Sequence, residues 1–303
     1  MRLSFLYWNT ANKPSRVSIL ENVLRETPKD IVILSECHER LPQSFCDDYG
    51  LVELKLHSAE REVLQQRLYY RKLLLISFKH LNNYSEDEVE EIIISQTIFG
   101  QIISREIKKM SRLSLIEVTF DKETFLLAIV HLPSKKNLDE ISQLQAASNY
   151  KRVILERSSN YKNQIVVVGD FNMNPFDAGM VEPHGFFAIN YKKKVQDETV
   201  FQHSTEIMFY NPSWNLLGDY DKLNDISVVS GSHFYSGAPS KKLFWHLFDQ
   251  VIVSKKMITN FVENELEVMQ IKEIVDEVQT TVTRRNALYS DHLPIKFTLN
   301  FKK

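Results

Sequence analysis

Acidic, amide and imidazole side chains recur next to apolar, strand-like segments of this 303-residue chain. Asn9 ends the first such segment, Glu36 follows the run 31–34, and Asp170 follows the run 165–168. Rigid strands that deliver side chains to one edge of a sheet provide the preorganisation that a reactive site requires. The complete set of candidate residues is Asn9, Glu36, His131, Asp170, Asn172, Asp249, Asp291 and His292.

These side chains suit a hard divalent cation. Carboxylate and amide oxygens are the ligands that Mg²⁺ and Mn²⁺ prefer. The two cysteines, Cys37 and Cys46, have no Cys-x-x-Cys spacing and cannot make a structural zinc site unaided. The expected cofactor is therefore Mg²⁺ or Mn²⁺.

The segment Gly169-Asp170-Phe171-Asn172 has two interpretations. Gly169 permits a sharp turn at the strand end. In extended chain, residues two apart point to the same side, so Asp170 and Asn172 would face one site while Phe171 lies in the core. Alternatively, Asp and Asn bond backbone amides in an ordinary turn. The segment alone favours neither interpretation.

A second motif, Ser290-Asp291-His292, places an imidazole beside a carboxylate. Because its proton is movable near neutral pH, a histidine there can act as a base, an acid or a phosphate contact. Taken alone, such a pair is more typical of a hydrogen-bond cluster at the start of a strand. Asp249, in front of another apolar run, is equally ordinary by itself.

The apolar pattern predicts the elements that position these residues. A helix is expected from Ser15 to Thr27, with Pro28 marking its end. A second helix is expected after a capping box of Asn137 and Glu140, with one side lined by Ile141, Leu144, Val153 and Ile154. Strands are expected at 1–9, 31–34, 73–76, 113–120, 125–130, 165–168, 248–253 and 293–299. Helices and strands without regular alternation predict layered sheets flanked by helices.

Composition predicts one globular domain over residues 1–303, with 43% hydrophobic and 25% charged residues. The longest apolar runs fall far below the roughly 20 residues of a spanning helix, so no transmembrane segment is expected. Residues 1–9 lack the features of a signal peptide, and the cytoplasm is the expected location.

The acidic segment 85–91 is expected to be solvated helix or loop. A net charge of -2 does not indicate attraction of the whole protein to nucleic acid.

Taken together and in order, the motifs resemble the endonuclease/exonuclease/phosphatase (DNase-I-like) superfamily. Its members include apurinic endonucleases, pancreatic-type deoxyribonucleases, neutral sphingomyelinases and inositol polyphosphate 5-phosphatases. The resemblance spans nearly the whole chain through Trp8-Asn9, Leu34-Ser35-Glu36, His131-Leu132, Gly169-Asp170-Phe171-Asn172, Asp249-Gln250 and Ser290-Asp291-His292-Leu293-Pro294. It implies an α/β fold, a four-layered α/β/β/α sandwich of two packed mixed β-sheets flanked by helices, with the site at one edge.

The resemblance also implies roles. Glu36 would be the principal metal ligand, with Asn9 and Asp291 nearby in the metal shell. The catalytic residues would be Asp170, Asn172, His292, Asp249 and His131. Asp170 would orient or deprotonate the attacking water, and Asn172 would assist Asp170. His292 would contact the scissile phosphate or shuttle a proton, held by Asp249, and His131 would contact the phosphate. Gln250 stands where an aromatic residue or histidine often follows the family aspartate, which alters packing without removing a charge. The strand near Leu73 to Ser77 lacks the glycine-rich start common in relatives.

The substrate class is predicted from weaker signals. His131 in a His-Leu-Pro context resembles the deoxyribonuclease, sphingomyelinase and 5-phosphatase side of the superfamily. Basic residues near the motifs could form a positive rim for a polyanion, or be ordinary solubilising loop residues: Lys135-Lys136, Lys241-Lys242 and Arg284-Arg285. Lys192-Lys193-Lys194 lie in a separate loop. Aromatic residues could stack on bases, or lie in the core: Phe209-Tyr210, Trp214, Phe234-Tyr235 and Phe244-Trp245 with His246.

These signals predict a metal-dependent phosphodiesterase or nuclease acting on DNA or RNA, with no obligate protein partner. Two alternatives remain. One is the same chemistry on a small or lipid-borne phosphate, such as a phosphoinositide or sphingomyelin. The other is a catalytically inactive binding scaffold, against which the retention of every motif acid and of His292 argues.

Overall fold

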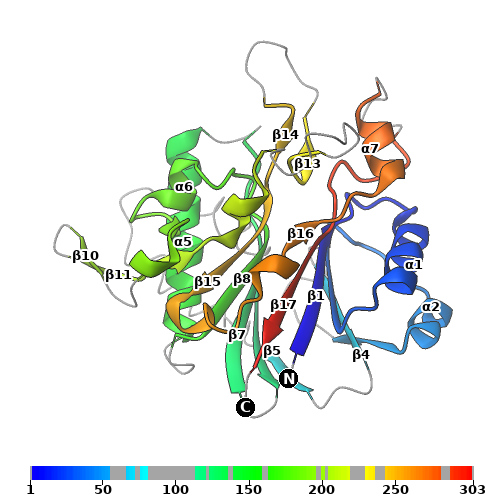
Figure 1. Cartoon of the computed structure of the whole chain (residues 1–303), viewed down its shortest axis with the longest axis horizontal. Helices are drawn as coiled ribbons and strands as arrows, with labels where there is room; N and C mark the ends of the chain where they lie inside the picture. The colour runs from blue at the N-terminus through cyan, green and yellow to red at the C-terminus, as the bar shows by residue number, and fades with distance from the viewer. Residues whose placement is uncertain are drawn as a thin grey trace, which may run out of the picture.

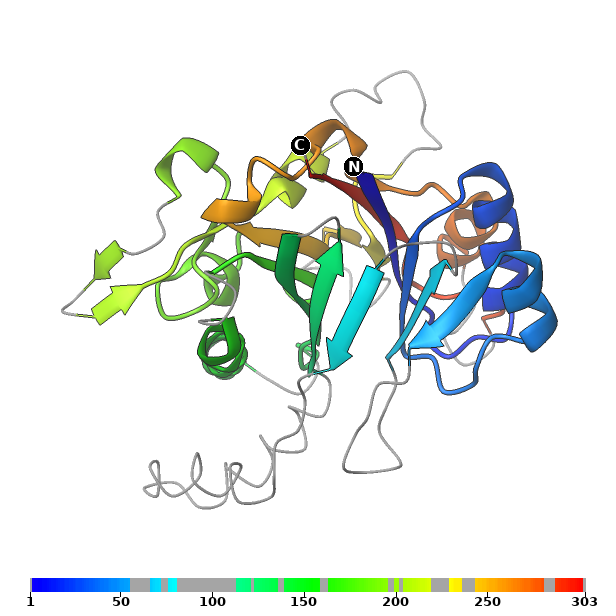
Figure 2. The ribbon, with the colours of Figure 1, turned by 90° about the horizontal axis from the view of Figure 1, so that it is seen from below.

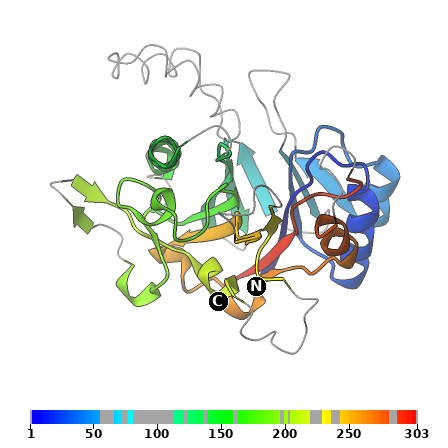
Figure 3. The same ribbon diagram turned by 90° about the horizontal axis from the view of Figure 1, so that it is seen from above.

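Two β-sheets lie face to face at the centre of the molecule, with helices on the outer side of each (Figure 1). The computed structural model describes residues 2–54, 66–71, 76–80, 113–120, 123–135, 139–158, 163–195, 199–201, 204–218, 229–235, 243–280 and 287–301. Views along the layers show the same order of helix, sheet, sheet and helix (Figures 2 and 3). The four-layered sandwich implied by the motifs is therefore confirmed.

The first sheet has six strands in the order β16-β17-β1-β2-β4-β3. β1 lies at its centre, parallel to β2 and antiparallel to β17. The bounds are β1 Arg2–Asn9, β2 Ile31–Ser35, β3 Leu51–Leu54, β4 Arg67–Arg71, β16 Glu267–Val268 and β17 Ile295–Asn300. The helices on its outer side are α1 Arg16–Glu26, α2 Gln43–Asp48 and α7 Lys272–Val278.

The second sheet has seven strands in the order β5-β6-β7-β8-β15-β12-β9. The bounds are β5 Ile76–His80, β6 Leu113–Phe120, β7 Glu123–His131, β8 Ile165–Asp170, β9 Ala188–Ile189, β12 Phe209–Tyr210 and β15 Asp249–Ser254. Its outer helices are α5 Glu140–Ser158 and α6 Ala178–Val181. Two small hairpins pair β10 Thr199–Phe201 with β11 Ser204–Glu206, and β13 His233–Phe234 with β14 Trp245–His246. Short 3₁₀ turns are η2 Lys192–Lys194, η3 Pro212–Leu216, η6 Lys255–Met257 and η7 Glu263–Glu265.

Strand β8 shows why its sequence is apolar at every position. Val166 and Val168 lie in the core between the two sheets, whereas Ile165 and Val167 lie in the second core beneath α5. Side chains alternate across a strand, and a strand buried on both faces therefore has no polar positions. This double burial holds the polar end of the strand in a fixed place.

Helix α1 begins and ends within one residue of its predicted bounds, but the buried face of α5 differs from the prediction. Ile141 is 69% exposed, so its predicted place on the packed side is wrong. Val153 and Ile154 are buried as predicted, and Ala147 and Tyr150 are buried with them. Ile141 lies in the first turn, and the rotation of the helix is set by these later residues. Asn137, the run 73–75 and the acidic segment 85–91 lie outside the described residues.

Gly169 lies inside β8, so it does not form the predicted turn at the strand end. It pairs with Val130 of the parallel strand β7. A Cβ atom at this position would lie 1.9 Å from the carbonyl oxygen of Val130, and the φ angle of the residue is +156°. The glycine therefore permits close approach of the two strands that carry His131 and Asp170.

We expect Gly169→Ala to destabilise the fold by about 3 kcal/mol or more, because backbone atoms must move to admit the methyl group. Urea unfolding measures the loss. Gly50→Ala is the matched control, since Gly50 has φ +62° but no atom within 4 Å of the place that the added methyl group would take, and about 1 kcal/mol is expected there. An equal and small loss in both variants would contradict this account of Gly169.

No helix in the described part of the chain is long and apolar enough to cross a membrane.

Candidate active site

The predicted site residues come together at one edge of the two sheets. Strands β1, β2, β7 and β8 all end at this edge, and β15 and β17 begin there. In Figure 1 the edge lies at the top, below the β13–β14 hairpin and opposite both chain termini. Asp170 and Asp249 are direct neighbours in the β8–β15 register. The site therefore draws residues from both sheets.

Two carboxylates, Glu36 and Asp170, share the same polar partners. The Nδ2 atom of Asn9 donates to Asp170 Oδ2 at 3.0 Å and to Glu36 Oε1 at 3.3 Å. The Nε2 atom of His131 lies 3.5 Å from the same Glu36 oxygen and 3.6 Å from the same Asp170 oxygen. The Oδ1 atom of Asn9 accepts from the amide of Ala11. Asn9 and His131 thus orient two carboxylate oxygens toward one point.

The backbone of Glu36 adopts a left-handed conformation with φ +45°. The amide of Asn12 and the hydroxyl of Thr10 both donate to the Glu36 carbonyl oxygen, each at 2.7 Å. Non-glycine residues seldom adopt this conformation unless their surroundings fix it, and such residues concentrate at functional sites. The two bonds hold the Glu36 side chain at the end of β2 toward Asp170.

Asp249 and His292 form a buried pair. The Nδ1 atom of His292 lies 2.8 Å from Asp249 Oδ2. The amide of Asp249 donates to the hydroxyl of Ser232, and the hydroxyl of Ser290 donates to the carbonyl oxygen of Asn9. The Nε2 atom of His292 is left facing Asp170 Oδ2 at 3.9 Å. Asp249 therefore fixes the ring so that Nε2 points into the site.

The Asp170–Asn172 segment combines features of both interpretations offered by the sequence. Phe171 is fully buried in the core, as predicted. Asn172, however, has φ +51°, so the chain is not extended there, and its amide donates to Asp170 Oδ1 at 2.8 Å. Its side chain donates to the carbonyl oxygen of Leu132. The turn uses one carboxylate oxygen of Asp170 and leaves Oδ2 directed into the site.

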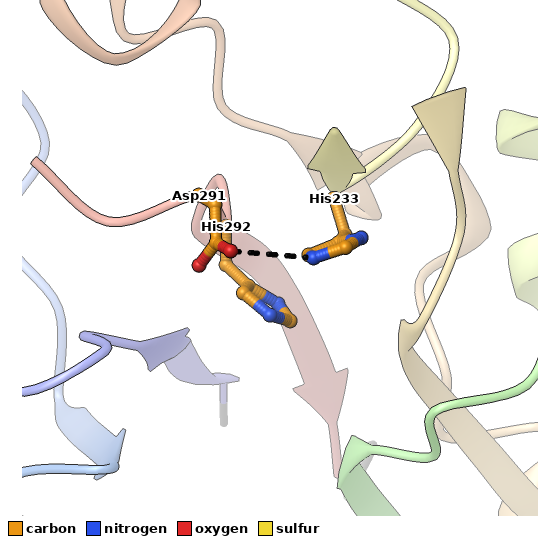
Figure 4. A group of neighbouring side chains, drawn as sticks. All are labelled: His233, Asp291 and His292. Atoms are coloured by element: carbon orange, nitrogen blue, oxygen red, sulfur yellow. Dashed lines mark ion pairs between the residues drawn. The ribbon is translucent and has the colours of Figure 1, made fainter. Parts of the chain in front are cut away.

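Asp291 is half-buried and lies beside a residue that the sequence reasoning missed (Figure 4). Its Oδ2 atom is 3.5 Å from Nε2 of His233, which lies on β13. The ring of His233 also contacts the ring of His292, with centroids 4.4 Å apart. His233 follows no apolar run, so the search at strand ends did not select it. The sequence offers only a weak signal for His233, which is a histidine next to Ser232 and on the N-terminal side of Asp249.

Burial and mutual charge shift the protonation of these groups. Burial raises the pKa of Asp170 to about 6, and Asp249 adds to the rise whereas His292 opposes it. Burial by itself would lower the pKa of His292. The carboxylates of Asp249 and Asp170 outweigh burial and raise that pKa to about 10. Asp170 is thus suited to accept a proton near neutral pH, and His292 is suited to stay cationic beside a phosphate.

Gln250 is buried and bonded on all sides. Its Nε2 atom donates to the carbonyl oxygens of Met173 and Leu247, and its Oε1 atom accepts from Asn211. The departure from the family pattern therefore changes packing behind the site. No carboxylate or imidazole of the site is replaced.

The residues present fit a hard divalent cation. Four carboxylates lie at this edge, from Glu36, Asp170, Asp249 and Asp291, and three of these side chains lie close to His292. The Oδ1 atom of Asp249 is buried and has no hydrogen-bond partner among the described residues. Buried negative charge of this density is costly unless a cation compensates it. Oxygen donors of this kind suit Mg²⁺ or Mn²⁺.

His246, on β14, provides a pH-dependent contribution to stability next to the site. Burial, together with His233 and Lys135, lowers its pKa to about 4. The Nδ2 atom of Asn174 lies 3.0 Å from Nδ1 of His246 and can donate a hydrogen bond to it when the ring is neutral. The folded state therefore resists protonation of this ring. Its contribution is complete above the unfolded pKa of about 6.5 and declines as the pH falls toward 4.

We expect His246→Asn to flatten the pH dependence of stability between pH 6.5 and 4, with an upper limit of about 3 kcal/mol. The measurement is the free energy of unfolding in urea at several pH values for both proteins. Identical slopes in the variant and the wild type would refute this role of His246.

Comparison with known proteins supports the fold. No family model matches the sequence, and no curated protein matches it. Among solved structures, TDP2 of D. rerio, complexed with a single-strand DNA product, is 17% identical with a TM-score of 0.55 over 99% of each chain. Truncated TDP2 of Caenorhabditis elegans is 15% identical with a TM-score of 0.52, over 99% of this chain and 98% of that one. An AP endonuclease from Archaeoglobus fulgidus is 13% identical with a TM-score of 0.51, over 99% of this chain and 100% of that one.

The similarity covers nearly all of this chain, and the two packed sheets and outer helices match the arrangement that the motifs implied. The chain therefore has the DNase-I-like α/β sandwich fold.

Proposed function

We propose that the protein is a divalent-metal-dependent phosphodiesterase that hydrolyses DNA or RNA. The observation that carries the proposal is the convergence of Glu36, Asp170, His131 and the Asp249–His292 pair at one edge of the sandwich. A metal-binding carboxylate, a candidate base and a fixed imidazole are the parts that in-line attack on a phosphodiester requires.

Glu36 would hold the ion, with Asn9 and Asp291 in its shell. When bound, the ion neutralises phosphate charge and stabilises the leaving oxygen. Asp170 orients the attacking water and accepts its proton, for which a pKa of about 6 is well matched. Asn172 holds Asp170 through its backbone amide.

The imidazoles bind the phosphate on either side of Asp170. His292 presents Nε2, because Asp249 engages Nδ1 and fixes the ring orientation. A cationic ring at this point offsets the negative charge that develops on the phosphate oxygens. His131 presents Nε2 from the end of β7, between Glu36 and Asp170.

The β13–β14 hairpin supports a nucleic-acid substrate. Phe234 and Trp245 pack edge to face within it, and Tyr235 and Phe244 beside them are 38% and 56% exposed. The hairpin is joined directly to the site, since the amide of Phe234 donates to the carbonyl oxygen of Asp291. Exposed aromatic rings next to a phosphate site are typical of proteins that stack on bases.

Other predicted contacts are less informative. Phe209 and Tyr210 are core residues, so they cannot stack on bases, and Trp214 packs against Phe176. Lys192, Lys193 and Lys194 form the exposed turn η2. Lys135 pairs with Asp177, and the remaining basic pairs lie outside the described residues.

The alternatives predict different substrates. A phosphatase or phospholipase-C-like enzyme would hydrolyse inositol phosphates or sphingomyelin and leave polynucleotides intact. A binding scaffold would hydrolyse nothing. We further propose that residues 1–303 form one catalytic domain, because the site takes residues from both sheets. A cytoplasmic location is proposed because the chain has only two cysteines, Cys37 and Cys46, and both are buried.

The purified protein is expected to cleave single- or double-stranded DNA or RNA in the presence of Mg²⁺ or Mn²⁺, and to stop when EDTA removes the metal. The panel includes bis-p-nitrophenyl phosphate, inositol phosphates and sphingomyelin. Turnover of only an inositol phosphate or sphingomyelin would favour the phosphatase alternative. Absence of any turnover, together with absent Mg²⁺ binding, would favour the scaffold.

A further inference from the structure

A cluster of two histidines and one aspartate lies beside the carboxylate pair of the site (Figure 4). A ring nitrogen of His233, a ring nitrogen of His292 and a carboxylate oxygen of Asp291 all lie within 4.8 Å of one another. His233 comes from β13, whereas Asp291 and His292 come from the segment before β17. The cluster forms because residues 233 and 292 pair as an isolated antiparallel bridge.

We propose that His233, Asp291 and His292 form a binding site for a borderline transition-metal ion, represented by Zn²⁺. Two imidazoles and one carboxylate are a donor set found in zinc sites that keep an open position. The same set is poor for Mg²⁺, which prefers oxygen ligands and water. The proposal goes beyond the phosphodiesterase function, because a Zn²⁺ ion would take the Nε2 atom of neutral His292 and so compete with the phosphate contact proposed for that atom.

The spacing of the donors agrees with a shared ion. The distance from His233 Nε2 to Asp291 Oδ2 is 3.5 Å, longer than the usual 2.7–3.2 Å of an N–H···O hydrogen bond. Two ligands about 2.0–2.2 Å from a tetrahedral ion are separated by roughly 3.3–3.6 Å. These two atoms therefore stand at the separation that a bridging ion gives.

The surroundings hold both imidazoles in place. His292 uses Nδ1 to bond Asp249, so Nε2 is the nitrogen that it can offer, and a carboxylate on the far nitrogen is the usual support of a ligating histidine. The ring of His233 stacks on Phe248, with centroids 5.0 Å apart and planes 21° apart. Both histidines are more than nine-tenths buried. Ligand side chains fixed in this way lose little entropy when an ion binds.

The proposed site is distinct from the oxygen-rich position between Glu36 and Asp170. Glu36 is not a member of the group formed by His233, Asp291 and His292. Asp291 would be common to the two positions, since the resemblance implies that it also belongs to the Mg²⁺ shell. A variant at His233 therefore affects the proposed Zn²⁺ site, and a variant at Glu36 affects the Mg²⁺ site.

Isothermal titration with Zn²⁺, in Mg²⁺-free buffer and with the full chain, tests the proposal. His233→Phe removes one ligand and keeps a ring that can stack on Phe248. His246→Phe makes the same change to the neighbouring histidine outside the cluster. We expect one Zn²⁺ per chain in the wild type, in Glu36→Gln and in His246→Phe. In His233→Phe the affinity should fall by at least the roughly 10–100-fold that loss of a supporting residue causes.

Co²⁺ provides a second readout that does not depend on activity. Its visible absorption band should show histidine coordination in the wild type and lose intensity in His233→Phe. Thermal unfolding confirms that each variant is folded. Equal Zn²⁺ affinity in the wild type and His233→Phe, or no Zn²⁺ binding by the wild type, would overturn the assignment. Neither result bears on the proposed Mg²⁺-dependent hydrolysis, which the substrate panel tests separately.

Discussion

Glu36→Gln is expected to reduce metal-dependent hydrolysis by roughly 10²–10³-fold while leaving the fold intact. The substitution keeps the size of the side chain and its acceptor oxygen, so Asn9 Nδ2 can still bond it. It removes the charge that would bind the ion, and a neutral amide is a weaker ligand for Mg²⁺ than a carboxylate. The rate loss should therefore be accompanied by a higher Mg²⁺ concentration at half-maximal rate.

The measurement is the initial rate on the preferred polynucleotide as a function of Mg²⁺ concentration. Glu39→Gln makes the same chemical change three residues away, on a side chain that is 79% exposed and pairs with Arg16. It should retain nearly the full rate. Wild-type rates in Glu36→Gln over the whole Mg²⁺ range would show that this carboxylate does not hold the ion.

His292→Asn is expected to lower kcat by roughly 10²–10⁴-fold, the range for loss of a positioned acid, base or charged donor. Asp249→Asn should give a loss of similar order, because an amide no longer fixes the imidazole with Nε2 directed at Asp170. Residues that act as a unit are strongly non-additive. The double variant should therefore be little slower than His292→Asn alone.

Single-turnover kinetics of the three variants measure this coupling. His38→Asn, at an exposed position near the Glu36 loop, serves as the histidine control. Multiplicative losses in the double variant would mean that Asp249 and His292 act independently. That result would overturn the account in which Asp249 acts through the imidazole of His292.

Much of the site was predictable because its residues follow doubly buried strands. Val166 and Val168 face one core, and Ile165 and Val167 face the other, so the strand is apolar throughout and Asp170 stands out at its end. The same contrast between an apolar strand and a polar residue at its end selects Glu36, which follows β2, and His131, which is the last residue of β7. In-order motifs then predicted the fold, which the structural comparison confirms.

Other features depend on distant contacts that no local pattern reports. His233 lies on a strand of two residues, and it reaches the site through pairing with the segment around His292. The role of Gly169 follows from the position of Val130 on another strand. The exposure of Ile141 follows from how the later turns of α5 pack. Sequence reasoning therefore found the residues at strand ends but not those placed by tertiary pairing.

The bond from the indole of Trp8 to the carbonyl oxygen of His292 joins residues that are 284 positions apart. The hydroxyl of Ser290 spans a similar separation to Asn9. A chain emerging from the ribosome has made Glu36, His131 and Asp170 long before it makes His292. The central pairing of β1 with β17 must also wait for that segment, since contacts so distant in sequence form late. A growing chain therefore cannot complete its candidate active site until synthesis has passed His292.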